Sequence, residues 1–395
     1  MKIIISGGGI GGLTTALCCL HHGHEVTVLE AAPELSEVGA GIQLPPNAMK
    51  VFAALGLEDL ITERAFRPEA LEARMGVSGR FLFSIPLTCK TKTRWGAPYL
   101  HIHRADYIAA LERALKEKNK RVIKLGHKVK SYSQSADKVH VKLADGAEVE
   151  GDILIGADGI HSAVRAQMLG PESPTYTGNI AWRMTVPVDK LGDVAPRPVA
   201  CVWMGRGRHC ATYRLRGSEL ANLVAVIEKD EWTSESWTEQ GSREEALKDF
   251  AGWHPTITRI IEQSDTLFRW ALFDRTPLKT WTDGRVVLLG DAAHPMLPFM
   301  AQGAAMAVED AWVLANQLSQ PGLSAGAALQ AYQSIRYDRA SKVQALSKAN
   351  ARTFHQQTLL GQLTTYAPMW LAGRVLPGAI VRHQDDLYKY DVTKT

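Results

Sequence analysis

Cysteine is scarce in this sequence, and its few copies are not arranged for cross-linking or for binding a metal. The five cysteines are Cys18, Cys19, Cys89, Cys201 and Cys210. They form no Cys-x-x-Cys pair and no metal-ligand spacing, and an odd, unpatterned set is typical of a reducing compartment. We therefore expect a cytoplasmic protein without a metal site, in which the adjacent pair in the first helical segment is part of the core.

Long apolar runs and an excess of one charge are also missing. The most apolar late stretch, 369–381, contains Arg374 and is too short to span a bilayer. The first residues read as a strand and not as a signal peptide. The net charge is only +4, and basic residues do not cluster with aromatic ones. We expect no membrane span and no nucleic-acid partner, while the mild positive charge suits a small anionic ligand.

The order of the expected elements predicts an α/β protein with a discontinuous first domain. A buried strand (2–6), a helix (13–22) and a second strand (25–30) form a βαβ unit. Strand-like alternation dominates later, and an apolar strand (285–289) is followed by helices at 302–317 and 327–353. We expect a Rossmann-like nucleotide-binding domain in two parts (1–170 and 276–345), a mostly antiparallel β-sheet substrate domain (171–275) and a C-terminal helical segment (346–395).

The turn after the first strand carries a glycine motif for a dinucleotide. Gly7 permits a tight turn, Gly9 lets the backbone approach a pyrophosphate, and Gly12 allows the helix to pack closely on the strand. The start of the helix offers free N–H groups and partial positive charge to that pyrophosphate. Glu30, at the end of the second strand, can accept hydrogen bonds from the ribose hydroxyls. Together these features indicate a dinucleotide site, but they do not choose the dinucleotide.

Two later segments indicate which dinucleotide binds. Residues 152–165 contain Asp158-Gly159, and residues 284–295 contain Gly290-Asp291. Each dipeptide alone would be read as a turn. In order and spacing, however, the three motifs resemble the fingerprints of the class A flavoprotein aromatic hydroxylases. The resemblance covers nearly the whole chain, including His-Arg-Ala-Asp at 103–106 and Tyr-x-x-x-Arg-x-x-Arg-Ala at 332–340, and it implies the aromatic hydroxylase fold with bound FAD.

The resemblance also assigns cofactor-binding residues. Asp291 follows an apolar strand, so its carboxylate would lie at the sheet edge where ligands bind and would hold a ribityl hydroxyl. The helix that begins near residue 302 would direct its N–H groups and dipole toward the flavin. The resemblance implies further cofactor contacts at Arg104, Asp158, Gln302, Gly303 and Ala304. No second Gly-x-Gly-x-x-Gly occurs, so NADH or NADPH would dock transiently, unlike in Baeyer–Villiger oxygenases and disulfide reductases.

A base is expected in the middle segment, because an electrophilic flavin C4a-hydroperoxide reacts best with an ionised ring. His209 and Tyr213 are four residues apart, which places both on one face of a strand. This stretch resembles the branch of 3-hydroxybenzoate 6-hydroxylase and 6-hydroxynicotinate 3-monooxygenase, where such a pair contacts the substrate. The resemblance also implies pocket positions at Gln43 and Phe299, where the hydroxynicotinate branch has histidines, and a Pro295 carbonyl facing the reactive flavin carbon. Arg183 and Arg214 are candidates for binding a carboxylate.

These residues predict a single-component FAD monooxygenase that uses NADH or NADPH and O2 to hydroxylate a small aromatic acid of the hydroxybenzoate, salicylate or hydroxypyridine-carboxylate type. Three alternatives stay open: a hydroxylase or epoxidase of a larger or heterocyclic substrate such as a urate-like or polyketide ring, a flavin oxidase without NAD(P)H, and a flavin-binding regulator. The motifs fit plain and decarboxylating hydroxylation equally, and a monomer as well as a homodimer.

Overall fold

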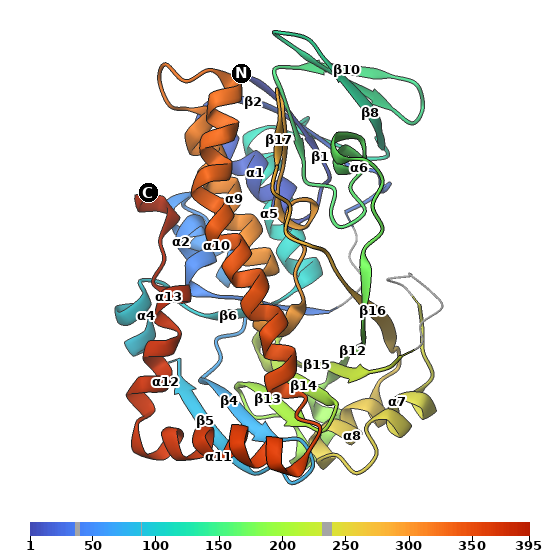
Figure 1. Ribbon diagram of the computed structural model, residues 1–395, viewed down its shortest axis with the longest axis vertical. Coiled ribbons are helices and arrows are strands. Elements are labelled where there is room, and N and C mark those ends of the chain that lie inside the picture. Colours follow the sequence, from blue (N-terminus) through green and yellow to red (C-terminus); the bar gives the residue numbers. More distant parts are fainter. Residues whose placement is uncertain (36–39, 88, 231–238) are drawn as a thin grey trace.

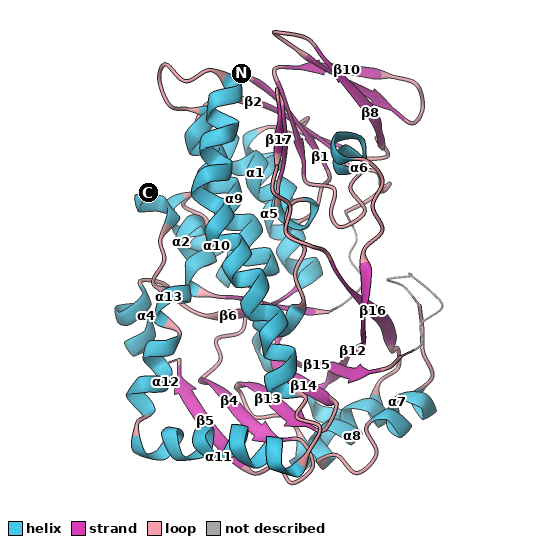
Figure 2. Ribbon diagram, in the orientation of Figure 1, coloured by secondary structure: helices cyan, strands magenta, loops and turns pink. Residues whose placement is uncertain are grey.

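The computed structural model describes residues 1–35, 40–87, 89–230 and 239–395, and it has two lobes joined by long helices (Figures 1 and 2). Trp232 and Trp237, within the expected substrate domain, lie outside the described residues. No helix in the described part is both long and apolar enough to cross a membrane.

The first lobe is built on a six-stranded sheet in the order β17-β18-β11-β1-β2-β7. Its strands are β1 (Lys2–Ser6), β2 (Glu25–Leu29), β7 (Ile123–Lys124), β11 (Ile153–Gly156), β17 (Thr282–Asp283) and β18 (Val286–Leu288). All pairings are parallel except that of β17 with β18. The central strands are continuous apolar runs, as expected where a parallel sheet is covered on both faces.

Helices and a small antiparallel sheet bury this lobe. The helices are α1 (Ile10–His21), α2 (Pro46–Ala54), α3 (Glu58–Thr62), α5 (Arg104–Lys118), α6 (Ala163–Leu169) and α9 (Gly303–Leu318). The small sheet contains β8 (Val129–Gln134), β9 (Val139–Leu143) and β10 (Glu148–Gly151), and its apolar residues belong to the same core. Residues on both sides of the second lobe in sequence therefore share one core.

The second lobe is a seven-stranded sheet in the order β16-β12-β15-β14-β13-β4-β5. Its strands are β4 (Ala70–Met75), β5 (Phe81–Pro86), β12 (Thr175–Pro187), β13 (Ala200–Gly205), β14 (Arg208–Leu215), β15 (Leu220–Glu228) and β16 (Phe268–Asp274). The pairing of β4 with β13 is parallel and the others are antiparallel, so the sheet is mixed. Helices α7 (Arg243–Asp249) and α8 (Pro255–Gln263) contribute to the core below it.

The C-terminal helices run along the molecule and end beside the first lobe (Figure 1). They are α10 (Ala325–Phe354), α11 (Leu359–Val375), α12 (Pro377–His383) and α13 (Asp385–Tyr388); α4 spans Cys89–Trp95. Short 3-10 turns occur at Val188–Val194, Arg216–Ser218, Gly290–Ala292, Pro298–Met300 and Val392–Lys394. The domain limits drawn from the sequence stay predictions. In the structure β4 and β5, from within residues 1–170, belong to the second sheet, and α10 spans the limit between residues 345 and 346.

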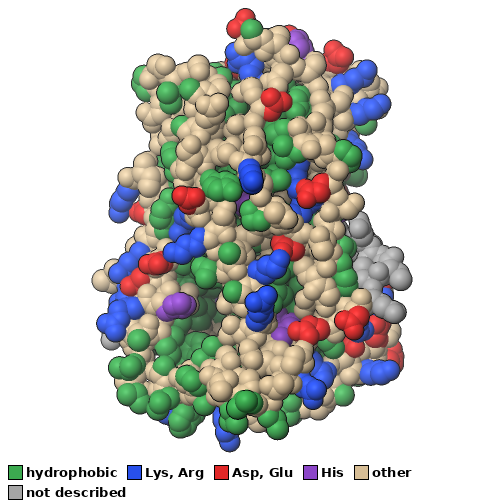
Figure 3. All heavy atoms as spheres, viewed as in Figure 1, with side chains coloured by type: hydrophobic (Ala, Val, Ile, Leu, Met, Phe, Trp, Pro, Cys, Tyr) green, Lys and Arg blue, Asp and Glu red, His purple; other side chains and the backbone are tan. Residues whose placement is uncertain are grey.

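Two further features frame the lobes. A two-stranded ribbon of β3 (Gly41–Leu44) and β6 (Leu100–His103) lies between them. At the lower end, where α11 lies, apolar side chains cover the surface in Figure 3. The exposed residues of α11 include Leu359, Leu360, Leu363, Leu371 and Val375. This face is separate from the cavity between the lobes.

Candidate active site

A cavity of about 350 Å³ lies between the two lobes. One wall, the nucleotide wall, consists of the turns after β1, β11 and β18 and the start of α9. The opposite wall consists of β12, β14, β15 and β16. The volume is in the range of small-molecule sites, and most of the lining is apolar. A ligand there would touch both lobes at once.

The three glycines of the first motif meet different surroundings. Gly7 has φ +105°, and a Cβ on it would lie 2.4 Å from the carbonyl oxygen of Ala157. A Cβ on Gly12 would lie 2.0 Å from the Gly7 carbonyl oxygen. Gly9 lines the cavity, and a Cβ there would have no described atom within 4 Å. Gly7 and Gly12 therefore serve the packing of β1, α1 and β11, while Gly9 leaves its backbone open to a ligand at the start of α1, which suits a pyrophosphate.

Glu30 shapes the same turn from the end of β2. Its Oε2 accepts a hydrogen bond from the backbone N–H of Gly8 at 2.6 Å, and its Oε1 accepts one from Ala32 at 2.7 Å. A carboxylate oxygen can accept more than one hydrogen bond. Glu30 can therefore hold the turn and still receive a ribose hydroxyl.

Asp158, in the second motif, caps a helix. Its Oδ2 accepts hydrogen bonds from the backbone N–H groups of Ala163 at 2.9 Å and Val164 at 3.3 Å, at the start of α6. Burial raises the pKa of Asp158 above its usual value, and the hydrogen bonds from Ser162 and the helix start oppose this rise. Its neighbours Ala157 and Gly159 line the cavity, and Asp158 does not. Its direct contact with a cofactor stays a prediction.

Asp291 and Arg104 both line the cavity. Asp291 follows β18, and its side chain is exposed because it opens onto the cavity. Loss of bulk water around the carboxyl group raises the pKa of Asp291 above its usual value, and the nearby His294 and Arg104 partly oppose this rise. Arg104 is the first residue of α5 and lines the same cavity. This pair offers an acceptor and a donor, as the hydroxyl-rich linker and phosphates of FAD require.

The start of α9 faces the cavity through its backbone. Gly303 and Ala304 line the wall, whereas Gln302 is buried behind it and its Oε1 accepts from Asn47 Nδ2 at 3.1 Å. The free N–H groups and the helix dipole favour negative charge on a ligand at this point. Gln302 was expected at the flavin edge; the structure places its side chain oxygen on Asn47, and the helix start itself forms the wall.

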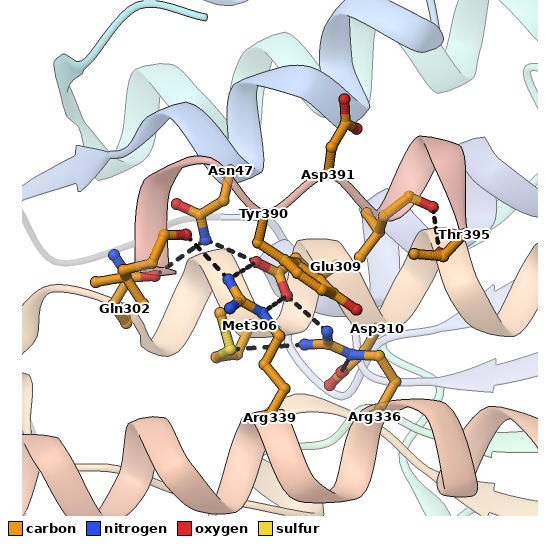
Figure 4. Close-up of polar contacts among 12 residues, drawn as sticks. Asn47, Gln302, Met306, Glu309, Asp310, Arg336, Arg339, Tyr390, Asp391 and Thr395 are labelled. Atoms are coloured by element: carbon orange, nitrogen blue, oxygen red, sulfur yellow. Dashed lines mark hydrogen bonds and ion pairs between the residues drawn. The ribbon is translucent and has the colours of Figure 1, made fainter. Parts of the chain in front are cut away.

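A buried charge network fixes this helix start (Figure 4). Glu309 on α9 accepts from Asn47 at 2.7 Å and from Arg336 and Arg339 on α10 at 2.6 and 2.7 Å. Asp310 accepts from Arg336 at 2.7 Å and pairs with His294, in the loop after β18, at 2.6 Å. Burial would raise the pKa of Asp310, but His294 and Arg336 outweigh it and lower the value to about 2. The loop and the helix start are thereby held in one arrangement.

On the opposite wall, His209, Ala211 and Tyr213 of β14 line the cavity, as their even spacing predicts. Burial, followed by the neighbouring His355, holds the pKa of His209 well below its usual value, so the ring is neutral near pH 7. Burial raises the pKa of Tyr213 to about 12, against an opposing effect of Arg183. The wall thus offers an uncharged imidazole and a protonated phenol.

The other predicted pocket residues also reach the cavity. Gln43 on β3 lines it and accepts a hydrogen bond from the Tyr99 hydroxyl, and the Phe299 ring lies 5.0 Å from the ring of His209. Pro295 lines it too, but its carbonyl oxygen accepts from Gln344 Nε2 on α10 at 2.8 Å. That carbonyl was expected to face the flavin; the structure shows it engaged by α10.

Of the two arginines considered for a carboxylate, only Arg183 lines the cavity. Its guanidinium lies 4.3 Å above the Trp270 ring and donates to the Gly41 carbonyl at 3.2 Å. Arg214 instead donates to the Pro196 carbonyl and to Ser218 Oγ, both at 2.7 Å. Sequence reasoning missed Trp270 and His355, the partner of His209, because no local pattern links segments so far apart in the chain.

Comparisons with known proteins agree with this geometry. A family model described as an FAD binding domain matches residues 1–347. The chain is 38% identical to 3-amino-4-hydroxybenzoate 2-monooxygenase of Streptomyces platensis over 354 residues, 90% of this chain and 88% of that one. It is 38% identical to 6-hydroxynicotinate 3-monooxygenase of Pseudomonas fluorescens, over 88% of this chain and 91% of that one. The crystal structure of Klebsiella pneumoniae HpxO with FAD and uric acid superposes with a TM-score of 0.87 at 28% identity, covering 98% of this chain and 96% of that one.

The geometry of the nucleotide wall also fits FAD. Gly9 leaves room beside the backbone, and the starts of α1 and α9 present free N–H groups. Asp291 and Arg104 add a hydrogen-bond acceptor and a donor to the cavity lining. The chain belongs to the FAD-binding family of class A flavoprotein aromatic hydroxylases.

Proposed function

We propose that this protein is a single-component monooxygenase that uses NADH or NADPH and O2 to hydroxylate a small aromatic acid carrying an ionisable ring substituent. The observation that supports this proposal is the continuity of one cavity. Its nucleotide wall fits FAD, and its opposite wall carries His209, Tyr213 and Arg183. A ring bound on the second wall would therefore lie against the redox-active part of the cofactor.

The cofactor would be held by the Gly9 backbone, Glu30, Arg104, Asp291 and the start of α9. When bound, FAD supplies the two-electron chemistry that links a reduced nicotinamide to O2 and the substrate. The dipole of α9 would stabilise negative charge that develops near its start.

The substrate-side residues have complementary tasks in this proposal. His209 is neutral and accepts the proton of the ring hydroxyl at Nε2, which makes the ring more nucleophilic. Tyr213 keeps its proton and donates a hydrogen bond to the resulting anion. Arg183 pairs with the carboxylate, and its stacking on Trp270 limits its orientation.

The relatives support an acidic aromatic substrate. Two of them, by name, act on an aminohydroxybenzoate and a hydroxynicotinate. The structural neighbour with bound uric acid favours a heterocycle as the second candidate. All three ligand types are flat, electron-rich rings that carry acidic groups.

A substrate panel tests the proposal. The holoenzyme is incubated with NADH or NADPH, ¹⁸O2 and one of 3-hydroxybenzoate, salicylate, 6-hydroxynicotinate, 3-amino-4-hydroxybenzoate or uric acid. We expect at least one acid to accelerate nicotinamide oxidation and to gain one ¹⁸O atom by mass spectrometry. Hydroxylation of uric acid alone would select the second candidate. Nicotinamide oxidation that no ring accelerates, without labelled product, would contradict both.

A further inference from the structure

His209 is the inner end of a line of hydrogen-bonded side chains that runs from the cavity wall to the surface. Its Nδ1 lies 2.6 Å from Nε2 of His355, which follows α10. Nδ1 of His355 lies 3.0 Å from Oε1 of Glu228, the last residue of β15. The residues His209 and His355 are each 4% exposed, whereas the Glu228 side chain is 42% exposed. The three residues therefore connect a buried wall of the cavity with solvent.

We propose that His355 and Glu228 form with His209 a proton relay, which carries the ring proton of the substrate between the cavity and solvent. His209 is the residue that would touch the substrate, and His355 and Glu228 are positioning residues that act through it. The inference rests on the proposed function, which it deepens by naming the path of the proton.

The carboxylate at the outer end dictates the hydrogen positions along the chain. An ionised Glu228 can only accept, so Nδ1 of His355 must carry the hydrogen. In a neutral imidazole the other nitrogen is then an acceptor, so Nδ1 of His209 must donate to Nε2 of His355. This leaves Nε2 of His209 as a bare lone pair, and it makes no hydrogen bond to any described residue. Glu228 thereby prepares a proton acceptor at the cavity wall.

The relay conserves protons at every step. The substrate O–H bond breaks as its proton bonds to Nε2 of His209, and the Nδ1 proton of His209 moves to Nε2 of His355. The Nδ1 proton of His355 then passes to Glu228 and from there to water. The substrate keeps the electron pair as an anion. A proton that travels inward by the reverse path restores the starting tautomers.

The surroundings of His209 favour such a path. The rings of Phe299 and Phe354 pack against it, with centroids 5.0 and 5.1 Å away, and shield it from bulk water. Burial, followed by the adjacent His355, holds its pKa well below the usual range, so the protonated ring is disfavoured. Among the described residues, the charged group that contacts His355 is Glu228, which also accepts from Gln357. A proton accepted at the wall is stabilised only after it has moved outward.

The first test reads the hydrogen positions without any substrate. In the FAD-loaded protein labelled with ¹⁵N-histidine, the ¹⁵N shifts of His209 and His355 are assigned with His209→Gln and His355→Gln. We expect both rings to be Nδ1–H tautomers above pH 7. In Glu228→Gln an amide can donate as well as accept, so this single tautomer should be lost. Nε2–H tautomers in the wild type would overturn the relay, whatever the substrate is.

The second test measures proton movement. A pH jump is applied to the holoenzyme with bound 3-hydroxybenzoate or 6-hydroxynicotinate, and ionisation of the ring is followed by its ultraviolet absorbance. We expect His355→Ala to slow ionisation by about tenfold or more, and added imidazole to restore the rate. Gln357→Ala, which removes a bond to Glu228 but no link of the chain, is the matched control and should leave the rate unchanged.

The outcomes separate the relay from the proposed function. An unchanged ionisation rate in His355→Ala, with the probe still bound and FAD still present, would overturn the relay and leave hydroxylation standing. A slowed rate that imidazole does not restore would also overturn it, because His355 would then only support the fold. If neither probe binds to the wild type, the proposed substrate class is contradicted, and the tautomers alone decide the relay.

Discussion

The glycines of the first turn show that identical residues can have unrelated tasks. Gly12 is confined by the Gly7 carbonyl oxygen, 2.0 Å from where its Cβ would lie, whereas Gly9 has open space beside it. In the sequence both are letters of one motif. Only the structure separates the glycine that the fold needs from the glycine that a ligand needs.

This contrast predicts different defects for two alanine substitutions. Gly9→Ala should leave the melting temperature of the apoprotein unchanged but weaken FAD binding by about tenfold or more, since a methyl group would occupy the space of the pyrophosphate. Gly12→Ala should lower the apoprotein melting temperature. Calorimetry and FAD titration check both variants, and a destabilised Gly9→Ala apoprotein would contradict the assignment.

His209 should be essential for coupling and dispensable for the cofactor. In His209→Gln we expect normal FAD affinity and a loss of about 10²- to 10⁴-fold in hydroxylation, with the electrons released as hydrogen peroxide. Arg214→Lys, on the same strand but outside the cavity wall, is the control. The product and peroxide formed per nicotinamide are measured, and full coupling in His209→Gln would remove this residue from the mechanism.

Buried histidines predict how stability depends on pH. Burial lowers the pKa of His101 to about 3, partly offset by the backbone of Arg214, and the pKa of His209 is lowered as well. The unfolded chain therefore takes up protons below about pH 6.5 that the folded protein refuses, so stability is highest above that pH and falls as the pH decreases. Each such histidine contributes a slope of about 1.4 kcal/mol per pH unit.

The slope can be assigned by substitution. Between pH 6.5 and 4.5, His101→Leu should flatten the fall in the unfolding free energy of the apoprotein by about one such slope. His383→Leu, at an exposed position, is the control and should leave the slope unchanged. Urea denaturation across this range gives the slopes, and equal slopes in wild type and His101→Leu would contradict the buried-histidine assignment.

At the scale of elements, α9 is positioned by charge as much as by packing. Its Glu309 and Asp310 are completely buried and satisfied by Arg336 of α10. Removing one partner of a buried ion pair leaves the other charge uncompensated, which is far more costly than losing an exposed pair. The network is the reason that the helix start can face the cavity in a fixed orientation.

Two arginine substitutions test this network. Arg336→Leu should cost about 3–5 kcal/mol of unfolding free energy and weaken FAD binding, because Glu309 and Asp310 lose their main partner. Arg339→Leu should cost less, since its side chain is 13% exposed and Glu309 keeps Arg336 and Asn47. Urea denaturation measures both. Equal costs would contradict the dominant position of Arg336.

Much of the first lobe could be predicted because its signals are local. Periodicity and turn residues predict the strand, glycine turn and helix of residues 2–22. They also predict the apolar strand before Asp291. The even spacing of His209 and Tyr213 likewise predicts a shared face. The direction of the Gln302 side chain and the Pro295 carbonyl could not be predicted, because Asn47 and Gln344, which engage them, come from distant helices.

At the scale of the whole molecule, the pairing of strands far apart in the chain could not be predicted from the sequence. The second sheet recruits β4 and β5 from within the expected first domain, and the parallel pairing of β4 with β13 joins segments more than one hundred residues apart. His355 reaches His209 across a similar separation. Alternation within a strand indicates which residues share a face, but it does not identify the neighbouring strand.

The central claim is that cofactor and substrate share one cavity, and the absorbance of the bound flavin tests it most directly. Titration of the oxidised holoenzyme with the acid that the panel identifies should produce a saturable change in the visible flavin spectrum. Ala211→Phe, which fills the wall between His209 and Tyr213, should retain FAD and abolish that change. An acid that binds without perturbing the flavin spectrum would contradict the shared cavity. So would an acid-induced spectral change in Ala211→Phe as large as that in the wild type.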